Sequence, residues 1–102
     1  MGMVSPLGLD TDSTWQALLA GKSGMDYITL FNAESYDTRF AAEVKGFDPT
    51  AYMERKEARR MDRFAQLAVA ASLQAVAQAV IEKGLVDSSD FAVIVGSGIG
   101  GL

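Results

Sequence analysis

Five basic side chains lie close together in the middle of this sequence and could bind an acidic partner. They are Arg55, Lys56, Arg59, Arg60 and Arg63, five of the nine Lys and Arg residues in a chain with a net charge of −4. Such a cluster is either a solvated helix face, which contributes little to stability, or a docking surface for an oppositely charged partner. The concentration of positive charge in an acidic protein speaks for docking, and the residues alone leave both interpretations open.

A glycine-rich loop near the end of the sequence could bring backbone N–H groups close to an anion. Gly96, Gly98 and Gly101 match the G-x-G-x-x-G pattern of dinucleotide-binding loops and follow an apolar run. That pattern also needs a following helix and an acidic residue about twenty positions later, and the sequence reaches neither. The loop is either a glycine turn after a sheet strand, which we favour, or a dinucleotide-binding half.

The residue types that are missing narrow the chemistry further. The sequence contains no Cys and no His, which excludes a thiolate nucleophile, an imidazole base, the usual zinc site and a disulfide framework. The negative net charge argues against nucleic-acid binding, and the apolar stretches are too short to span a membrane. We expect no cofactor and no metal, and the absence of Cys agrees with a cytoplasmic location.

The first part of the chain predicts a helix and then a strand. Asp12 or Ser13 is suited to cap a helix through Trp15, and Gly21 and Gly24 are expected to stop it. We expect Trp15 to pack between this helix and a sheet. The alternation over residues 39–45 predicts a strand with one apolar face, made of Phe40, Ala42 and Val44.

The middle of the chain predicts one long helix over residues 56–83, closed by Gly84. An apolar arc of about 80° on this helix is rich in Ala, which would let another backbone come close. Its members are Met61, Phe64, Ala68, Ala71, Ala75 and Ala79. In the same helix, Lys56, Arg59, Arg60 and Arg63 would share a neighbouring arc.

The apolar run at residues 91–95 predicts a strand buried on both faces, as in a parallel sheet covered by helices. The fold class is therefore α/β. A single long helix beside one such strand, at the end of the sequence, predicts a fragment of a larger domain rather than a complete one.

Three segments, in this order, resemble the elongating β-ketoacyl-[acyl-carrier-protein] synthases. The first comprises residues 2–8 (GMVSPLG) with 13–15 (STW) and 18–24 (LLAGKSG), the second residues 55–62 (RKEARRMD), and the third residues 95–102 (VGSGIGGL). The resemblance covers essentially the whole chain. Phe31, Tyr36 and Phe40, together with residues 98–101 (GIGG), make it closer to the type II than to the type I synthases.

The resemblance implies the amino-terminal half of a thiolase-like layered α/β fold, incomplete at both ends. Residues 1–102 would be an amino-terminal fragment of the synthase's amino-terminal domain, without the region that carries the catalytic Cys and two His residues. The family's reaction is a decarboxylative Claisen condensation of an acyl thioester with malonyl-ACP. The implied partners are acyl carrier protein, the acyl and malonyl thioester substrates and a second subunit of a homodimer, with no nucleic acid and no membrane.

By the same resemblance, Lys56, Arg59 and Arg60 would dock the carrier protein. Ile99 would project towards the acyl pocket, and Gly96, Gly98, Gly100 and Gly101 would let the loop pass close to substrate and to the dimer partner. No catalytic residue is expected within residues 1–102. The alternative from another class is a small interaction module whose basic helix binds an acidic partner.

Overall fold

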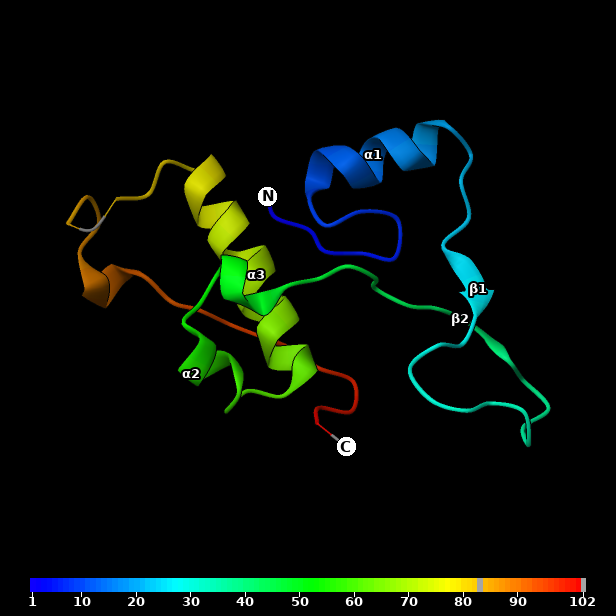
Figure 1. Cartoon of the computed structure of the whole chain (residues 1–102). Helices are drawn as coiled ribbons and strands as arrows, with labels where there is room; N and C mark the ends of the chain where they lie inside the picture. The colour runs from blue at the N-terminus through cyan, green and yellow to red at the C-terminus, as the bar shows by residue number, and fades with distance from the viewer. Residues whose placement is uncertain (83, 102) are drawn as a thin grey trace. The chain divides into compact units, whose positions relative to one another are not determined.

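The computed structural model describes residues 1–82 and 84–101, and the chain forms two compact units (Figure 1). One unit is Val4–Phe47. The other combines Met1–Met3 with Asp48–Leu102. The helices and strands are α1, β1 and β2 in the first unit, and α2 and α3 in the second, with two short 3₁₀ turns.

Helix α1 (Thr11–Leu19) begins two or three residues earlier than its expected caps imply. Asp10 is the N-cap, and its carboxylate accepts a hydrogen bond of 2.7 Å from the Ser13 backbone N–H, so the prediction of Asp12 or Ser13 as cap was wrong. Gly21 ends the helix with φ 67°, as expected. Lys22 N–H then donates to the Ala17 carbonyl, as in a Schellman motif.

The buried face of α1 differs from the predicted one. Thr14 and Ala17 are buried, whereas Trp15 is 56% exposed, so its predicted packing role was wrong. The reason is local: Thr14 Oγ1 lies 2.9 Å from Ser5 Oγ, and this hydrogen bond places the turn at Ser5 against the polar side of the helix.

Strands β1 (Met25–Tyr27) and β2 (Phe40–Ala42) form an antiparallel pair in which Asp26 lies opposite Ala41. The strand predicted for residues 39–45 is thus present but shorter. Its predicted apolar face was wrong, since Phe40 is 57% exposed and Glu43 is buried. Glu43 is buried because backbone N–H groups of the neighbouring loop bond its carboxylate.

In the second unit, the predicted long helix is two helices. A 3₁₀ turn (Pro49–Ala51) leads to α2 (Arg55–Ala58), and α3 (Arg63–Gln78) begins after a break at residues 59–62. The end at Gly84 was also wrong, because α3 stops six residues earlier. Val80 takes φ 53° there, and Ile81 N–H donates to the Val76 carbonyl, which completes a Schellman motif without glycine.

The Ala-rich side of α3 does receive another backbone, as predicted. Gly2 lies so close that an added Cβ would overlap the Ala71 carbonyl oxygen and come within 2.7 Å of the Ala75 nitrogen. Beside it, Met3 N–H donates to Gln74 Oε1 at 3.0 Å, and Gln74 Nε2 donates to the Tyr52 hydroxyl at 2.9 Å. The segment before residue 4 is thereby anchored to α3.

Residues 91–95 do not form the predicted buried strand. The segment is extended and pairs with no other strand in the described part of the chain, and Ile94 is 94% exposed. Its apolar composition suits a sheet, but a parallel strand forms only beside a partner strand. None of the helices in residues 1–82 and 84–101 has both the length and the apolarity that a membrane span requires.

Candidate functional site

The basic residues predicted to dock a partner lie on α2 and the turn that follows it. Lys56 is within α2, Arg59 is its C-cap, and Arg60 is the next residue of the turn. All three are exposed. Because the helix breaks before α3, Arg63 does not share a helix with them, and the predicted arc of four basic residues was wrong for Arg63. Lys56, Arg59 and Arg60 lie along α2 and its closing turn, where Arg59 N–H still bonds the Arg55 carbonyl.

A turn of this kind needs its backbone groups fixed if it is to present side chains in one arrangement. Gln66, in the first turns of α3, reaches back and donates from Nε2 to the carbonyls of Ala58 (2.8 Å) and Met61 (3.3 Å). The turn also closes on itself through a 2.9 Å bond from Arg60 N–H to the Glu57 carbonyl. Ala58 is buried beneath it.

Sequence reasoning missed Gln66. Within one continuous helical pattern, a glutamine on the polar side is expected to face solvent, and nothing in its spacing indicates a bond to a preceding helix. Only the break at residues 59–62 brings the two carbonyls within its reach.

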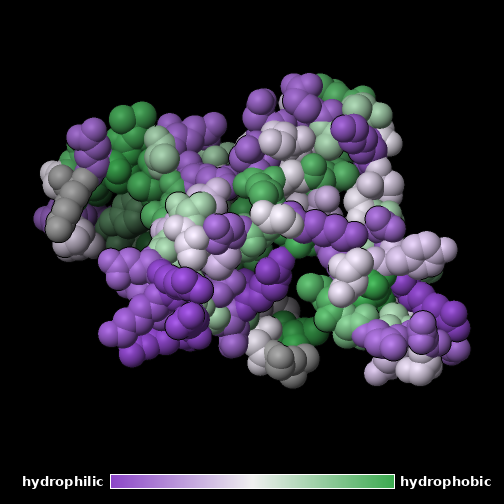
Figure 2. Space-filling view, viewed as in Figure 1, coloured by the Kyte–Doolittle hydropathy of each residue, from purple (hydrophilic) through white to green (hydrophobic). Residues whose placement is uncertain are grey.

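The charge on this surface is mixed but mainly positive. Residues 54–63 carry five basic and three acidic side chains, the acids being Glu54, Glu57 and Asp62. Figure 2 shows a broad hydrophilic area over α2 and the adjoining turn. An exposed surface with excess positive charge can attract an acidic protein and orient it, with little contribution to folding stability.

Most of the glycine loop is exposed rather than packed. Ile99 is 77% exposed, and Gly100 takes φ 77° while its N–H donates to Ser97 Oγ at 2.9 Å. A Cβ at Gly96 or Gly98 would meet open space. The described residues show no strand before this loop, so the structural setting of a dinucleotide-binding motif is not present.

Gly101 differs from the other loop glycines, because the space that a side chain would occupy at this position is already filled. A Cβ there would overlap the carboxyl group of Asp62, the N-cap residue of α3. The structure therefore brings the end of the glycine loop to the edge of the basic turn, a contact that the sequence did not predict.

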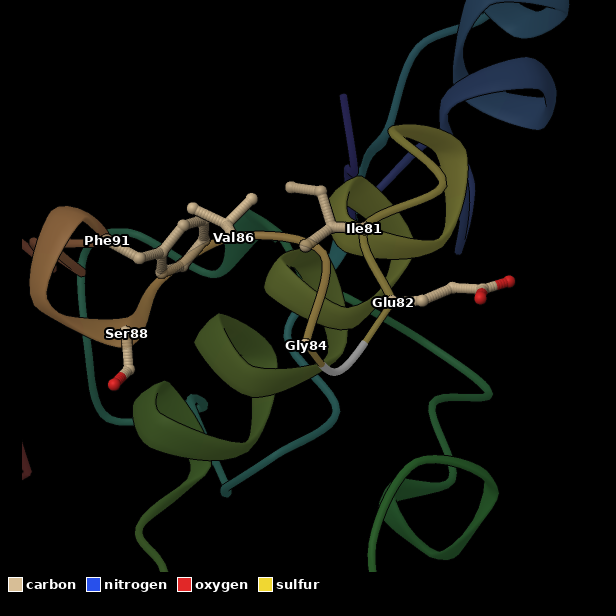
Figure 3. Close-up of a pocket in the computed structure, with 6 residues that line it drawn as sticks. All are labelled: Ile81, Glu82, Gly84, Val86, Ser88 and Phe91. Carbon is tan, nitrogen blue, oxygen red and sulfur yellow. The ribbon is translucent and has the colours of Figure 1, made fainter.

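A cavity of about 310 Å³ lies beyond the end of α3 (Figure 3). Ile81, Val86 and Phe91 face it, while the carboxylate of Glu82 points away. The walls are mainly apolar, and among the described lining residues the one charged side chain, Glu82, does not point into the cavity. The cavity can hold an apolar group.

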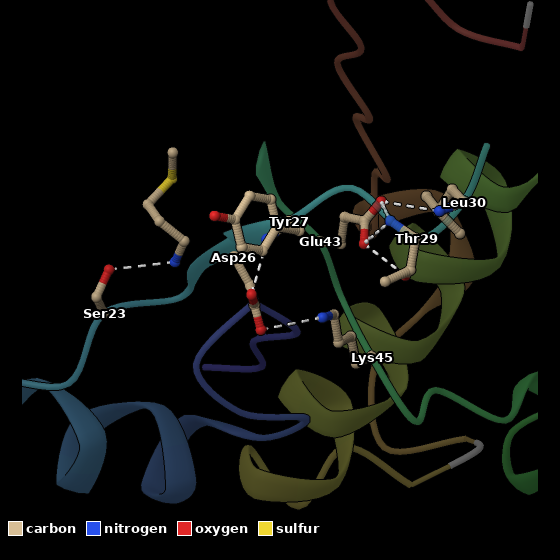
Figure 4. Close-up of polar contacts among 8 residues, drawn as sticks. Ser23, Asp26, Tyr27, Thr29, Leu30, Glu43 and Lys45 are labelled. Carbon is tan, nitrogen blue, oxygen red and sulfur yellow. Dashed lines mark hydrogen bonds and ion pairs between the residues drawn. The ribbon is translucent and has the colours of Figure 1, made fainter. Parts of the chain in front are cut away.

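The carboxylate of Glu43 accepts several hydrogen bonds, and its role is local (Figure 4). Glu43 accepts hydrogen bonds from the Thr29 hydroxyl (2.8 Å) and from the backbone N–H groups of Thr29 and Leu30 (3.1 Å each). The bond from the Thr29 side chain is the main cause that lowers the pKa of Glu43. Nearby, Lys45 pairs with Asp26 at 3.6 Å.

Neither unit contains a metal centre in its described residues, since no three acidic side chains gather closely enough to hold an ion. With no Cys and no His in the sequence, the chain supplies neither a thiolate nor an imidazole.

Comparison with known proteins places these features in a family. The family model described as "Beta-ketoacyl synthase, N-terminal domain" matches residues 1–102. The chain is 47% identical over 102 residues to 3-oxoacyl-[acyl-carrier-protein] synthase 2 of Vibrio cholerae, 42% identical to the protein of that name from Synechocystis, and 41% identical to that of Staphylococcus aureus. These alignments cover all of this chain and 24–25% of each relative, so the chain spans about a quarter of the length of the curated relatives it matches.

Proposed function

The chain belongs to the family of β-ketoacyl synthase N-terminal domains, and we propose on that basis that it acts as part of a 3-oxoacyl-[acyl-carrier-protein] synthase in fatty-acid elongation. The observation that carries the proposal is the match of the family over the entire chain, with the same named enzyme among relatives from several bacteria. The helices and short strands of the structure are consistent with the α/β class of that family.

The proposed reaction joins two thioesters. An acyl group is transferred from its carrier to a cysteine thiolate, forming a new thioester and releasing the carrier thiol. Malonyl-ACP then loses CO₂, and the resulting carbanion attacks the acyl carbonyl, expelling the cysteine and lengthening the chain by two carbons. Residues 1–102 contain no group for these steps. Their part in the reaction is to bind and to position.

Carrier docking is assigned in this proposal to Lys56, Arg59 and Arg60. They are exposed, lie within five consecutive positions and sit on a turn that Gln66 bonds at two carbonyls. A positive turn of fixed shape suits a strongly acidic partner, because complementary charge speeds encounter and fixes register.

Reversal of the three charges tests the docking proposal in a synthase that contains this chain. The triple change Lys56→Glu, Arg59→Glu and Arg60→Glu should raise KM for acyl-ACP while small thioesters that bypass the carrier are turned over as before. Lys22→Glu, an exposed reversal in the other unit, is the control and should leave both unchanged. A wild-type KM for acyl-ACP in the triple variant would refute docking at this turn.

The pocket role of Ile99 and the wider architecture complete the proposal. Ile99 is the only bulky side chain between Gly96 and Gly101, so Ile99→Phe should suppress elongation of long primers more than of short ones. The loop glycines Gly98 and Gly100 would let the backbone approach the substrate.

The same proposal includes a thiolase-like layered fold, of which residues 1–102 form an incomplete part. It also includes a homodimer and a cytoplasmic location.

Surface area supports a role within a larger protein. The chain exposes 7988 Å², whereas two separate compact bodies of half its mass would expose roughly 6,700 Å². Large apolar side chains are among the exposed ones, including Ile94 and Val93. Thermal melting of the isolated chain by circular dichroism distinguishes part of a larger protein from an independent interaction module, because the module should unfold in one cooperative transition.

A further inference from the structure

Asp62 and Gly101 touch although they are far apart in the sequence. A Cβ built on Gly101 would lie 3.1 Å from the Cβ of Asp62 and would overlap its carboxyl oxygen. Both residues belong to the same compact unit. The carboxyl group therefore fills the space where any residue other than glycine would place its side chain.

The carboxyl group of Asp62 is not used to cap its own helix. Asp62 is the N-cap residue of α3, yet its side chain makes no capping hydrogen bond, and only its backbone carbonyl bonds Gln66 N–H at 3.0 Å. A carboxylate at this end of a helix is favoured by the helix dipole. Its position against Gly101 is thus compatible with α3 and is not explained by capping.

We infer that Asp62 is a positioning residue that connects the basic turn to the glycine loop. The inference rests on the proposed function, since it assigns Asp62 a part in selecting acyl chains. On one side Asp62 follows the turn that carries Arg59 and Arg60, and on the other it holds Gly101, two residues beyond Ile99. Movement of Asp62 shifts the loop that carries Ile99 without changing the docking charges.

The contact predicts that position 101 requires glycine. Gly101→Ala forces Asp62 into another rotamer or pushes the loop away. Shortening Asp62 to Ala removes the carboxyl group and makes room for the added methyl group. The damage from Gly101→Ala should therefore be smaller when Asp62→Ala is also present, a form of coupling that only neighbouring residues show.

Glu54 provides a matched control for loss of the charge. It is the N-cap residue of α2, also makes no side-chain capping bond, and flanks the same basic cluster. Glu54→Ala and Asp62→Ala each remove one negative charge beside the docking surface. Only Asp62→Ala removes the contact with the loop.

Amide chemical shifts of a synthase that contains this chain, labelled at its glycines, test the contact directly and do not depend on any activity. Asp62→Ala should shift the signals of Gly98, Gly100 and Gly101, and Glu54→Ala should leave them in place. Asp62→Asn keeps the shape of the side chain and serves if the alanine variant fails to fold: it should shift Gly101 and spare the rest of α3. Unchanged loop signals in both Asp62 variants, or equal shifts in Glu54→Ala, would overturn the inference.

Substrate selection by the synthase tests the connection. With thioesters that bypass the carrier, Asp62→Ala should change the ratio of kcat/KM for long and short primers by about two- to tenfold. Glu54→Ala should leave that ratio unchanged, and the two variants should alter KM for acyl-ACP alike. An unchanged ratio in Asp62→Ala would refute the connection. If the wild-type protein performs no condensation, the proposed function fails, while the chemical shifts still decide whether Asp62 holds the loop.

Discussion

Replacement of Gln66 by Met is the most informative test of how the basic turn is built. The two side chains are similar in size, but methionine cannot donate a hydrogen bond. The substitution leaves every charge of the cluster in place. It removes the two bonds that join α3 to the carbonyls of Ala58 and Met61. The expected result is a looser turn that docks the carrier less well.

The size of the effect follows from the two bonds. The bond to Ala58 is 2.8 Å long and strong, whereas the 3.3 Å bond to Met61 is weak. The Ala58 carbonyl keeps a second partner, the Met61 N–H at 3.3 Å, so it is not left entirely unsatisfied. We expect a loss of about 1 kcal/mol, the typical net value of one hydrogen bond. If this energy holds the turn in its docking conformation, KM for acyl-ACP rises about fivefold.

Steady-state kinetics of the synthase with acyl-ACP and with small thioesters measures this change. Gln66→Met should raise KM only for acyl-ACP, while Gln16→Met, at an exposed position of α1, should change neither. Lower thermal stability of Gln66→Met with a wild-type KM for acyl-ACP would contradict a role of Gln66 in docking. A rise of equal size for small thioesters would instead indicate general damage.

Three further substitutions should change the free energy of unfolding, which urea titration measures. The hydrogen bond from the Thr29 hydroxyl lowers the pKa of Glu43 in the folded chain. The carboxylate therefore stabilises the fold fully above its unfolded pKa of about 4.5, and this stabilisation is lost as the pH falls through the lower folded pKa. Glu43→Gln should remove this dependence of stability on acid pH. Gly2→Ala should destabilise by about 1–3 kcal/mol, because the new methyl group meets the backbone at Ala71, and an unchanged midpoint would contradict that contact. Val80→Gly should stabilise by about 1 kcal/mol, since a β-branched residue at φ 53° is strained, and a loss of stability would show otherwise.

Local signals in the sequence predicted local structure well. Gly21 was predicted to end α1, and it does so with positive φ. The Ala-rich side of α3 was predicted to admit another backbone, and Gly2 lies against it. Each of these depends on residues that are close in sequence or on the size of one side chain. Such effects can be worked out before the tertiary contacts are known.

Long-range contacts account for what the sequence could not predict. The break between α2 and α3 contains neither Gly nor Pro, and it is held by the side chain of Gln66 from the following helix. Glu43 is buried because Thr29 and Leu30, adjacent in space but well separated in sequence, supply its N–H donors. The contact of Asp62 with Gly101 leaves no periodic pattern at all. In each case a side chain meets backbone groups that the linear pattern does not place nearby.

Because of the break between α2 and α3, docking can depend separately on the shape of the turn and on its charge. On one continuous helix, basic residues share a face through periodicity, and Gln66 would not affect them. On a turn, their arrangement depends on Gln66, while their attraction for an acidic carrier depends on charge.

Salt should therefore distinguish the variants. Gln66→Met should weaken binding yet keep the wild-type slope of affinity against ionic strength, because every charge remains. Reversing Lys56 should flatten that slope, since rim charges act through long-range attraction that salt screens. Equal slopes in both variants would show that charge at this turn does not guide the carrier.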